Sequence, residues 1–142
     1  MNKVLNLIFF ITILQSAPVE AQNFWKKIKE SEITLRNGST REIIPTRYQT
    51  FRVDLPALKS HLKNAPLELN GSRSVSQFKV EMPDSEGNME TFVVYEAPSM
   101  EPGLAEKFPD IKSYKGYSTL SKLSQIRFAV SERGIHAVIN AA

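Results

Sequence analysis

Residues 126–139 read IRFAVSERGIHAVI and decide the fold of this 142-residue chain. Apolar residues alternate with more polar ones from Ile126 to Val130, and the same period of two returns from Ile135 to Ile139. Such alternation is typical of strands with one buried face and one solvated face. The residues ERG separate the two runs, and a glycine can take the left-handed backbone conformation that a hairpin loop needs. The stretch therefore predicts an antiparallel hairpin.

Earlier segments show further strand patterns. Residues 51–55 (FRVDL) and 78–82 (FKVEM) alternate between apolar and polar side chains. Residues 91–95 (TFVVY) are apolar on both faces, which suits an interior strand. The turn-forming sequence PDSEGN at residues 83–88 joins the last two runs into a second antiparallel hairpin. Residues 111–114 predict a brief additional strand.

Short helices are predicted between these strands. Asp54 can cap a helix that has Pro56 in its first turn and leucines at spacings of three and four. A second helix is expected within residues 97–108, with Pro102 in its first turn, and a third within residues 23–32 (NFWKKIKESE). The sum is an α+β domain: a mostly antiparallel sheet of about five to six strands with two or three short helices packed on one side.

The first residues have the layout of a secretory signal peptide. A lysine near the start precedes the apolar run VLNLIFFITIL at residues 4–14. Val19 and Ala21 are small or apolar residues at the −3 and −1 positions of a predicted cleavage site between Ala21 and Gln22. The apolar run is too short for a stable membrane span. Residues 1–21 are therefore expected to be removed, which leaves residues 22–142 as one secreted or periplasmic domain.

The composition argues against two classes of partner or site. The formal net charge is +3, and the one dense basic cluster is the short run KKIK at residues 26–29. Nucleic-acid binding calls for a basic stripe with interleaved aromatic side chains, so we expect no nucleic-acid partner. The chain contains no cysteine, which removes disulfide frameworks and thiolate metal sites from consideration.

No catalytic motif is present in the sequence. His61 and His136 are the two histidines, and they lack the one-turn spacing that a zinc peptidase helix requires. We expect both on the surface. No serine lies in a Gly-x-Ser-x-Gly elbow, and no glycine-rich phosphate loop precedes a helix. The sequence therefore predicts neither enzymatic activity nor a cofactor for this chain.

Four stretches occur in an informative order along residues 22–142. They are AQNFWKK from residue 21, VDLPALKS from residue 53, LAEKFPDIKSY from residue 104, and the pair IRFAVS and GIHAVI in the final hairpin. Together they resemble the N-terminal pro-region, or propeptide, of secreted bacterial zinc metalloproteases of the reprolysin/adamalysin-like class. The resemblance covers nearly the whole chain after the predicted signal peptide.

The resemblance implies a non-catalytic role. In that family the pro-region precedes a catalytic domain that carries the motif His-Glu-x-x-His-x-x-Gly-x-x-His, which is absent from this sequence. Residues 117–125 (YSTLSKLSQ) also replace the acidic, turn-forming stretch that is usual there, and the family's pro-region normally continues past the last hairpin. The implied protein is a pro-domain truncated before the catalytic domain. It would assist the folding of a metallopeptidase domain or mask it, in cis or from a neighbouring reading frame, and zinc would belong to that domain alone.

Residues 108–111 are the candidate site. We expect Phe108, Pro109, Asp110 and Ile111 to form a rigid corner between a helix and a strand, with Phe108 and Ile111 anchored in the core. The corner serves either peptidase docking or structure alone, because proline fixes the bend in both cases. Two alternative functions stay open: a stand-alone secreted binding module that uses an exposed sheet edge, and a non-functional remnant of a protease gene.

Overall fold

The structure, a computed structural model, describes residues 23–33, 45–68 and 76–140. The predicted signal peptide lies outside the described residues. In chain order the elements are β1 (Trp25–Lys27), the 3-10 helix η1 (Glu30–Glu32), β2 (Phe51–Val53), α1 (Leu55–Leu62), β3 (Lys79–Pro83), β4 (Met89–Glu96), α2 (Pro102–Lys107), β5 (Lys112–Ser118), β6 (Gln125–Ser131) and β7 (Gly134–Asn140). Within the described ranges, no helix is long and apolar enough to cross a bilayer.

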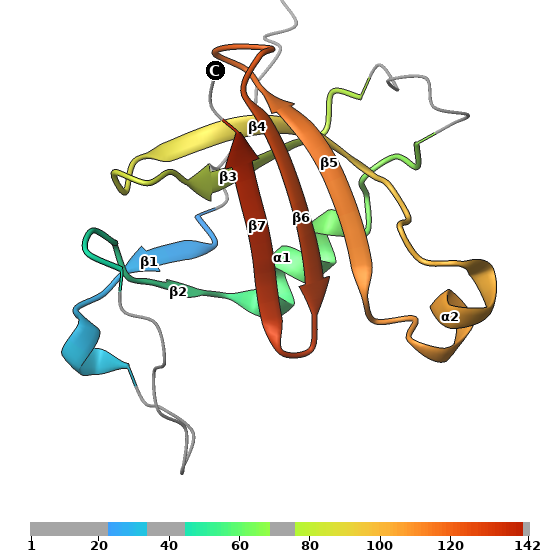
Figure 1. The fold of residues 1–142 in the computed structure, drawn as a ribbon, viewed down its shortest axis with the longest axis horizontal. Coiled ribbons are helices and arrows are strands. Elements are labelled where there is room, and N and C mark those ends of the chain that lie inside the picture. Colours follow the sequence, from blue (N-terminus) through green and yellow to red (C-terminus); the bar gives the residue numbers. More distant parts are fainter. Residues whose placement is uncertain (1–22, 34–44, 69–75, 141–142) are drawn as a thin grey trace, which may run out of the picture.

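The strands form two antiparallel sheets, which confirms the predicted α+β class. A five-stranded sheet has the order β3-β4-β5-β6-β7, and a two-stranded sheet pairs β1 with β2. In Figure 1, the axes of β5, β6 and β7 are nearly aligned on the page, with neighbouring strands pointing in opposite directions. β3 and β4 lie near the top of the view, at a steep angle to these three strands. The large sheet is therefore strongly twisted, as successive strands of a meander are expected to be.

Both predicted hairpins of the large sheet are present. In the β6–β7 hairpin, Ser131 pairs with Gly134, so the connecting loop is Glu132 and Arg133. Gly134 has a φ of +136°, a backbone conformation that side chains disfavour. The β3–β4 hairpin pairs Pro83 with Met89 across the predicted turn.

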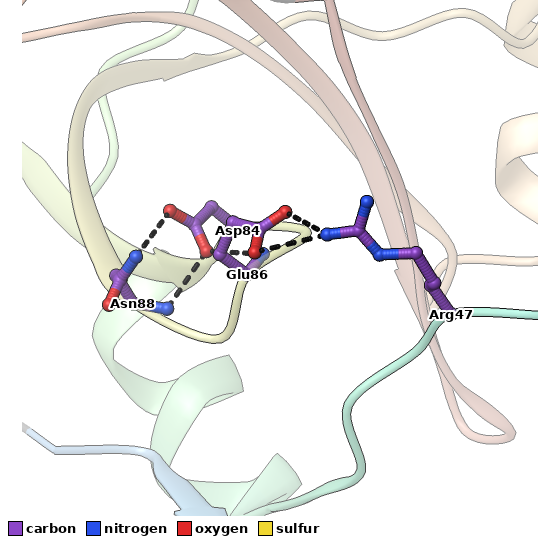
Figure 2. A network of polar contacts seen from close by, with 4 residues as sticks. All are labelled: Arg47, Asp84, Glu86 and Asn88. Carbon is purple, nitrogen blue, oxygen red and sulfur yellow. Dashed lines mark hydrogen bonds and ion pairs between the residues drawn. The ribbon is translucent and has the colours of Figure 1, made fainter.

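The β3–β4 turn is organised by one carboxylate. Figure 2 shows Asp84 accepting from the Asn88 side chain, and its Oδ1 also accepts 2.8 Å hydrogen bonds from the Glu86 and Asn88 backbone amides. Arg47, from the segment before β2, contacts Glu86 at 3.1 Å. The hydrogen bond from the Asn88 backbone amide is the largest cause that lowers the pKa of Asp84 below its ordinary value of 3.8. This carboxylate therefore favours folding above pH 3.8, and its contribution is lost as the pH falls through the lowered pKa.

The core lies between the large sheet and α1. Leu58 and Leu62 of α1 are almost completely buried, at 0% and 1% exposure. They belong to one apolar cluster with Phe92 of β4 and Ile126 of β6. Figure 1 shows α1 behind β6 and β7, in agreement with that cluster. The leucine spacing predicted from the sequence thus produces the face of α1 that packs on the sheet.

Asp54 caps α1 as predicted. Its Oδ1 accepts a 3.0 Å hydrogen bond from the Ala57 amide, and its own amide donates to the Phe24 carbonyl at 2.9 Å. The side chain therefore satisfies one of the backbone donors at the helix start, and the backbone ties that start to the segment before β1.

Replacing Asp54 with alanine is expected to lower the free energy of unfolding by about 1 kcal/mol, because the Ala57 amide loses its acceptor. Urea unfolding followed by far-UV circular dichroism measures the change. Asp54→Asn is the matched control, since an asparagine oxygen can accept the same hydrogen bond. Equal losses for the alanine and asparagine variants would contradict the capping role.

The helix predicted within residues 23–32 is wrong. The first part of this segment is β1, in which Trp25 pairs with Val53 of β2, and the second part is the single 3-10 turn η1. Phe24 is buried at 8% exposure, and the Trp25 indole N–H donates to the Glu81 carbonyl of β3 at 2.8 Å. Tertiary contacts of two adjacent aromatic residues therefore override a helical apolar spacing.

The second predicted helix and the strand after it are present with different extents. α2 begins after Glu101 and ends before Phe108, and β5 continues to Ser118 rather than stopping at Tyr114. No residue of α2 is buried. Figure 1 places α2 off the sheet, near the start of β5 and away from α1. Of the two α-helices that the structure describes, only α1 packs on the large sheet.

Candidate docking surface

The predicted corner at residues 108–111 is a hydrogen-bonded turn. The Phe108 amide donates to the Leu104 carbonyl at 3.1 Å, which closes the last turn of α2. The Ile111 amide then donates to the Phe108 carbonyl at 3.1 Å. Pro109 follows directly, where its ring prevents the helix from continuing and suits the second position of a turn. A hydrogen-bonded bend therefore lies at residues 108–111, and its rigidity stays a prediction.

The expected anchoring of this corner in the core is wrong. Phe108 is 50% exposed and Ile111 is 36% exposed. The reason is that α2 does not pack on the sheet, so the residues that follow it remain at the surface. Leu104, one helical turn before Phe108, is also 46% exposed. Three large apolar side chains thus lie within eight residues at the protein surface. A group of exposed apolar side chains can mark an interaction site, whereas a single exposed leucine is ordinary.

A cavity of about 400 Å³ adjoins this group. Its walls are the segment from Lys107 to Ile111 and the β6–β7 loop with its flanking Ser131. The loop contributes Glu132 and Arg133, and the first wall contributes Lys107 and Asp110, so charges of both signs line the cavity together with apolar side chains. We call the side chains of Leu104, Phe108, Pro109 and Ile111, with Glu132 and Arg133, the corner surface. Exposed apolar side chains beside charged ones are a combination that protein-binding patches use.

A second cavity of about 320 Å³ also adjoins the corner. Pro109 and Asp110 line both cavities, and Tyr114 of β5 forms part of the second one. Lys112 pairs with Glu96 at 3.2 Å at this site. Burial disfavours the phenolate and raises the pKa of Tyr114 from 10 to about 12, and the negative charge of Glu96 adds to the effect.

The raised pKa of Tyr114 makes stability depend on alkaline pH. Because the folded-state pKa exceeds the unfolded value of 10, the stabilisation is complete below pH 10 and is lost as the pH rises from 10 towards about 12. Absorbance titration of the phenolate should show a late step, from Tyr114, near pH 12. Tyr114→Phe should remove that late step alone. Ionisation of every tyrosine near pH 10 would contradict this environment.

The two histidines have different surroundings. His136 is exposed on β7, as expected. His61 is only partly exposed: its ring stacks on Phe78 at 4.5 Å and lies 5.3 Å from Phe24, and its Nε2 is 2.9 Å from the Lys79 carbonyl. His61 therefore lies at the surface with its ring partly covered by these neighbours. Within the described part of the chain, no three His, Asp or Glu side chains gather as metal ligands would.

The two edge strands of the large sheet, β3 and β7, differ in how far other parts of the chain cover them. Along β3, the outward carbonyls of Lys79 and Glu81 lie at hydrogen-bond distance from the His61 ring and the Trp25 indole, respectively. Side chains from α1 and β1 therefore cover that edge. Along β7, no strand pairs on the outer side within residues 23–33, 45–68 and 76–140.

No protein-family model matches the chain, and no curated protein or solved structure is similar enough to count as a match.

Proposed function

We propose that this chain is a non-catalytic, exported pro-domain that binds the catalytic domain of a zinc metallopeptidase and assists its folding or masks it. The proposal rests on the ordered resemblance of four stretches to the pro-regions of secreted bacterial reprolysin-like proteases. Zinc in this proposal belongs to the partner domain, and no residue of this chain is assigned to it.

The observation that carries the proposal is the exposure of Phe108 and Ile111. Both belong to the third of the four stretches, and they stand at the surface at 50% and 36% exposure. A hydrogen-bonded turn holds them, so little conformational entropy is lost when a partner covers them. Large side chains at the centre of an interface contribute most of the binding energy. Phe108 is accordingly the expected anchor of the docked complex.

The test measures binding between the full chain and the isolated catalytic domain of a secreted bacterial reprolysin-like peptidase. Calorimetry gives the dissociation constant, and hydrolysis of a short peptide reports masking. Phe108→Asp should weaken binding by about tenfold or more, because a charge would be buried against apolar surface.

Leu120→Asp is the matched control. Leu120 is 86% exposed and follows β5, whereas Phe108 precedes it, so the two positions lie at opposite ends of this strand. The control should bind as the unmodified chain does. Failure of the unmodified chain to bind, or equal weakening by both substitutions, would contradict docking through the corner surface.

A further inference from the structure

Among the strands that the structure describes, none pairs with the outer side of β7, so this side presents a row of backbone groups. The Ser118 amide of β5 donates to the Ser124 carbonyl at 2.9 Å, and this bond sets the alternation across β5, β6 and β7. Counting along the register directs the amides and carbonyls of Ile135, Ala137 and Ile139 away from β6. An edge strand of this kind is a template for pairing with another strand.

The composition of β7 offers no protection against such pairing. Its sequence, GIHAVIN, contains no Lys, Arg, Asp, Glu or proline, and the register with β6 is continuous with no bulge. Proteins usually block an open edge with one of these devices. The opposite edge, β3, carries Lys79, Glu81 and Pro83 and is covered by side chains as well. The contrast marks β7 as the pairing edge of the sheet.

β7 is also self-complementary about Ala137. In an antiparallel pair of two copies with the two-fold axis at Ala137, all seven residues of the strand find partners. Ile135 then faces Ile139 on the core side, and His136 faces Val138, which is 52% exposed, on the other side. Apolar and β-branched pairs at these positions stabilise a sheet, and no like charges oppose one another.

We propose that β7 pairs with β7 of a second copy of this chain, which joins two five-stranded sheets into one continuous antiparallel sheet. Ile135 and Ile139 are partly buried against the core of their own copy, so the paired strands extend that apolar face across the two-fold axis. The contact is small, about seven residues a side, and the dimer dissociates on dilution. This inference does not use Phe108 and does not depend on the proposed pro-domain function.

Sedimentation velocity of the full chain over a wide concentration range tests the pairing. The unmodified chain should pass from monomer to dimer as its concentration rises. Ala137→Pro should weaken the dimer by about tenfold or more, because proline removes an outward donor from each copy at the axis. It should leave the β6–β7 pairing intact, since that amide does not face β6, and circular dichroism verifies the fold.

Charge variants at the same position identify the occupant. Ala137→Lys and Ala137→Glu should each weaken the dimer by about two- to fivefold, because like charges then meet at the axis. An equimolar mixture should form a heterodimer tighter than either variant alone, which requires Ala137 to face its own counterpart. A chain that stays monomeric at every concentration, or a mixture no tighter than its components, would overturn the proposal. So would a monomer that pairs at β7 with an unrelated extended peptide.

Discussion

Replacing Leu58 with alanine is expected to lower the free energy of unfolding by about 2–5 kcal/mol, a large part of the total stability of a domain of this size. Leu58 is completely buried and is a central contact between α1 and the large sheet. The shortened side chain loses its transfer free energy and leaves a cavity that the surrounding strands fill only in part. Chemical denaturation with two optical probes measures the loss.

Leu123→Ala is the control for that substitution. Leu123 lies between β5 and β6 with 73% of its side chain exposed, so the same chemical change should alter stability by less than about 0.5 kcal/mol. If the two variants lost similar amounts of stability, α1 would not be packed as described.

Gly116→Ala should also destabilise the fold strongly, by about 1–3 kcal/mol. A Cβ added at Gly116 would overlap the Val93 carbonyl of β4 and lie 2.7 Å from Val94 Cγ1 and 3.2 Å from Ile126 Cγ2. Two of these atoms belong to buried side chains and one to backbone, so β5 would have to move away from β4. The midpoint of thermal unfolding reports the cost.

The same substitution at Gly103 should have the opposite sign. Gly103 lies in α2, and a Cβ built there meets no atom within 4 Å. Alanine should therefore stabilise the chain by up to about 1 kcal/mol through its higher helix propensity. An unchanged stability of the Gly116 variant would contradict the packing of β5 against β4. A loss of stability at Gly103 would contradict the open surroundings of that residue in α2.

Alternation and capping could be predicted from the sequence because they depend on neighbouring residues. The β6–β7 hairpin required only the period of two and the glycine at position 134, and α1 required only Asp54 and its leucines. The strand predicted at residues 111–114 is shorter than β5, because the later part of β5 lacks the alternation of apolar and polar residues. The buried positions of β5 are Tyr114, Gly116 and Ser118, which form no apolar pattern.

The features that could not be predicted depend on contacts between distant segments. Phe24 and Trp25 have a helix-like relation to Ile28, and only the pairing with β2 and the bond to Glu81 reveal a strand. The exposure of Phe108 had no local signal, because it follows from where α2 lies relative to the sheet. For the candidate site, the sequence could locate the bend at residues 108–111. It could not show that Phe108 and Ile111 are exposed rather than buried in the core.

The bond between Trp25 and Glu81 gives the chain an intrinsic optical reporter. Trp25 is the single tryptophan, and its indole bridges β1 of the small sheet to β3 of the large one at 2.8 Å. The emission maximum of Trp25 should shift to longer wavelength when the β1–β2 sheet separates from the large sheet, because water then replaces the Glu81 carbonyl as the partner of the indole. Comparison of that shift with the loss of far-UV ellipticity would reveal whether the two sheets melt as one cooperative unit or in sequence.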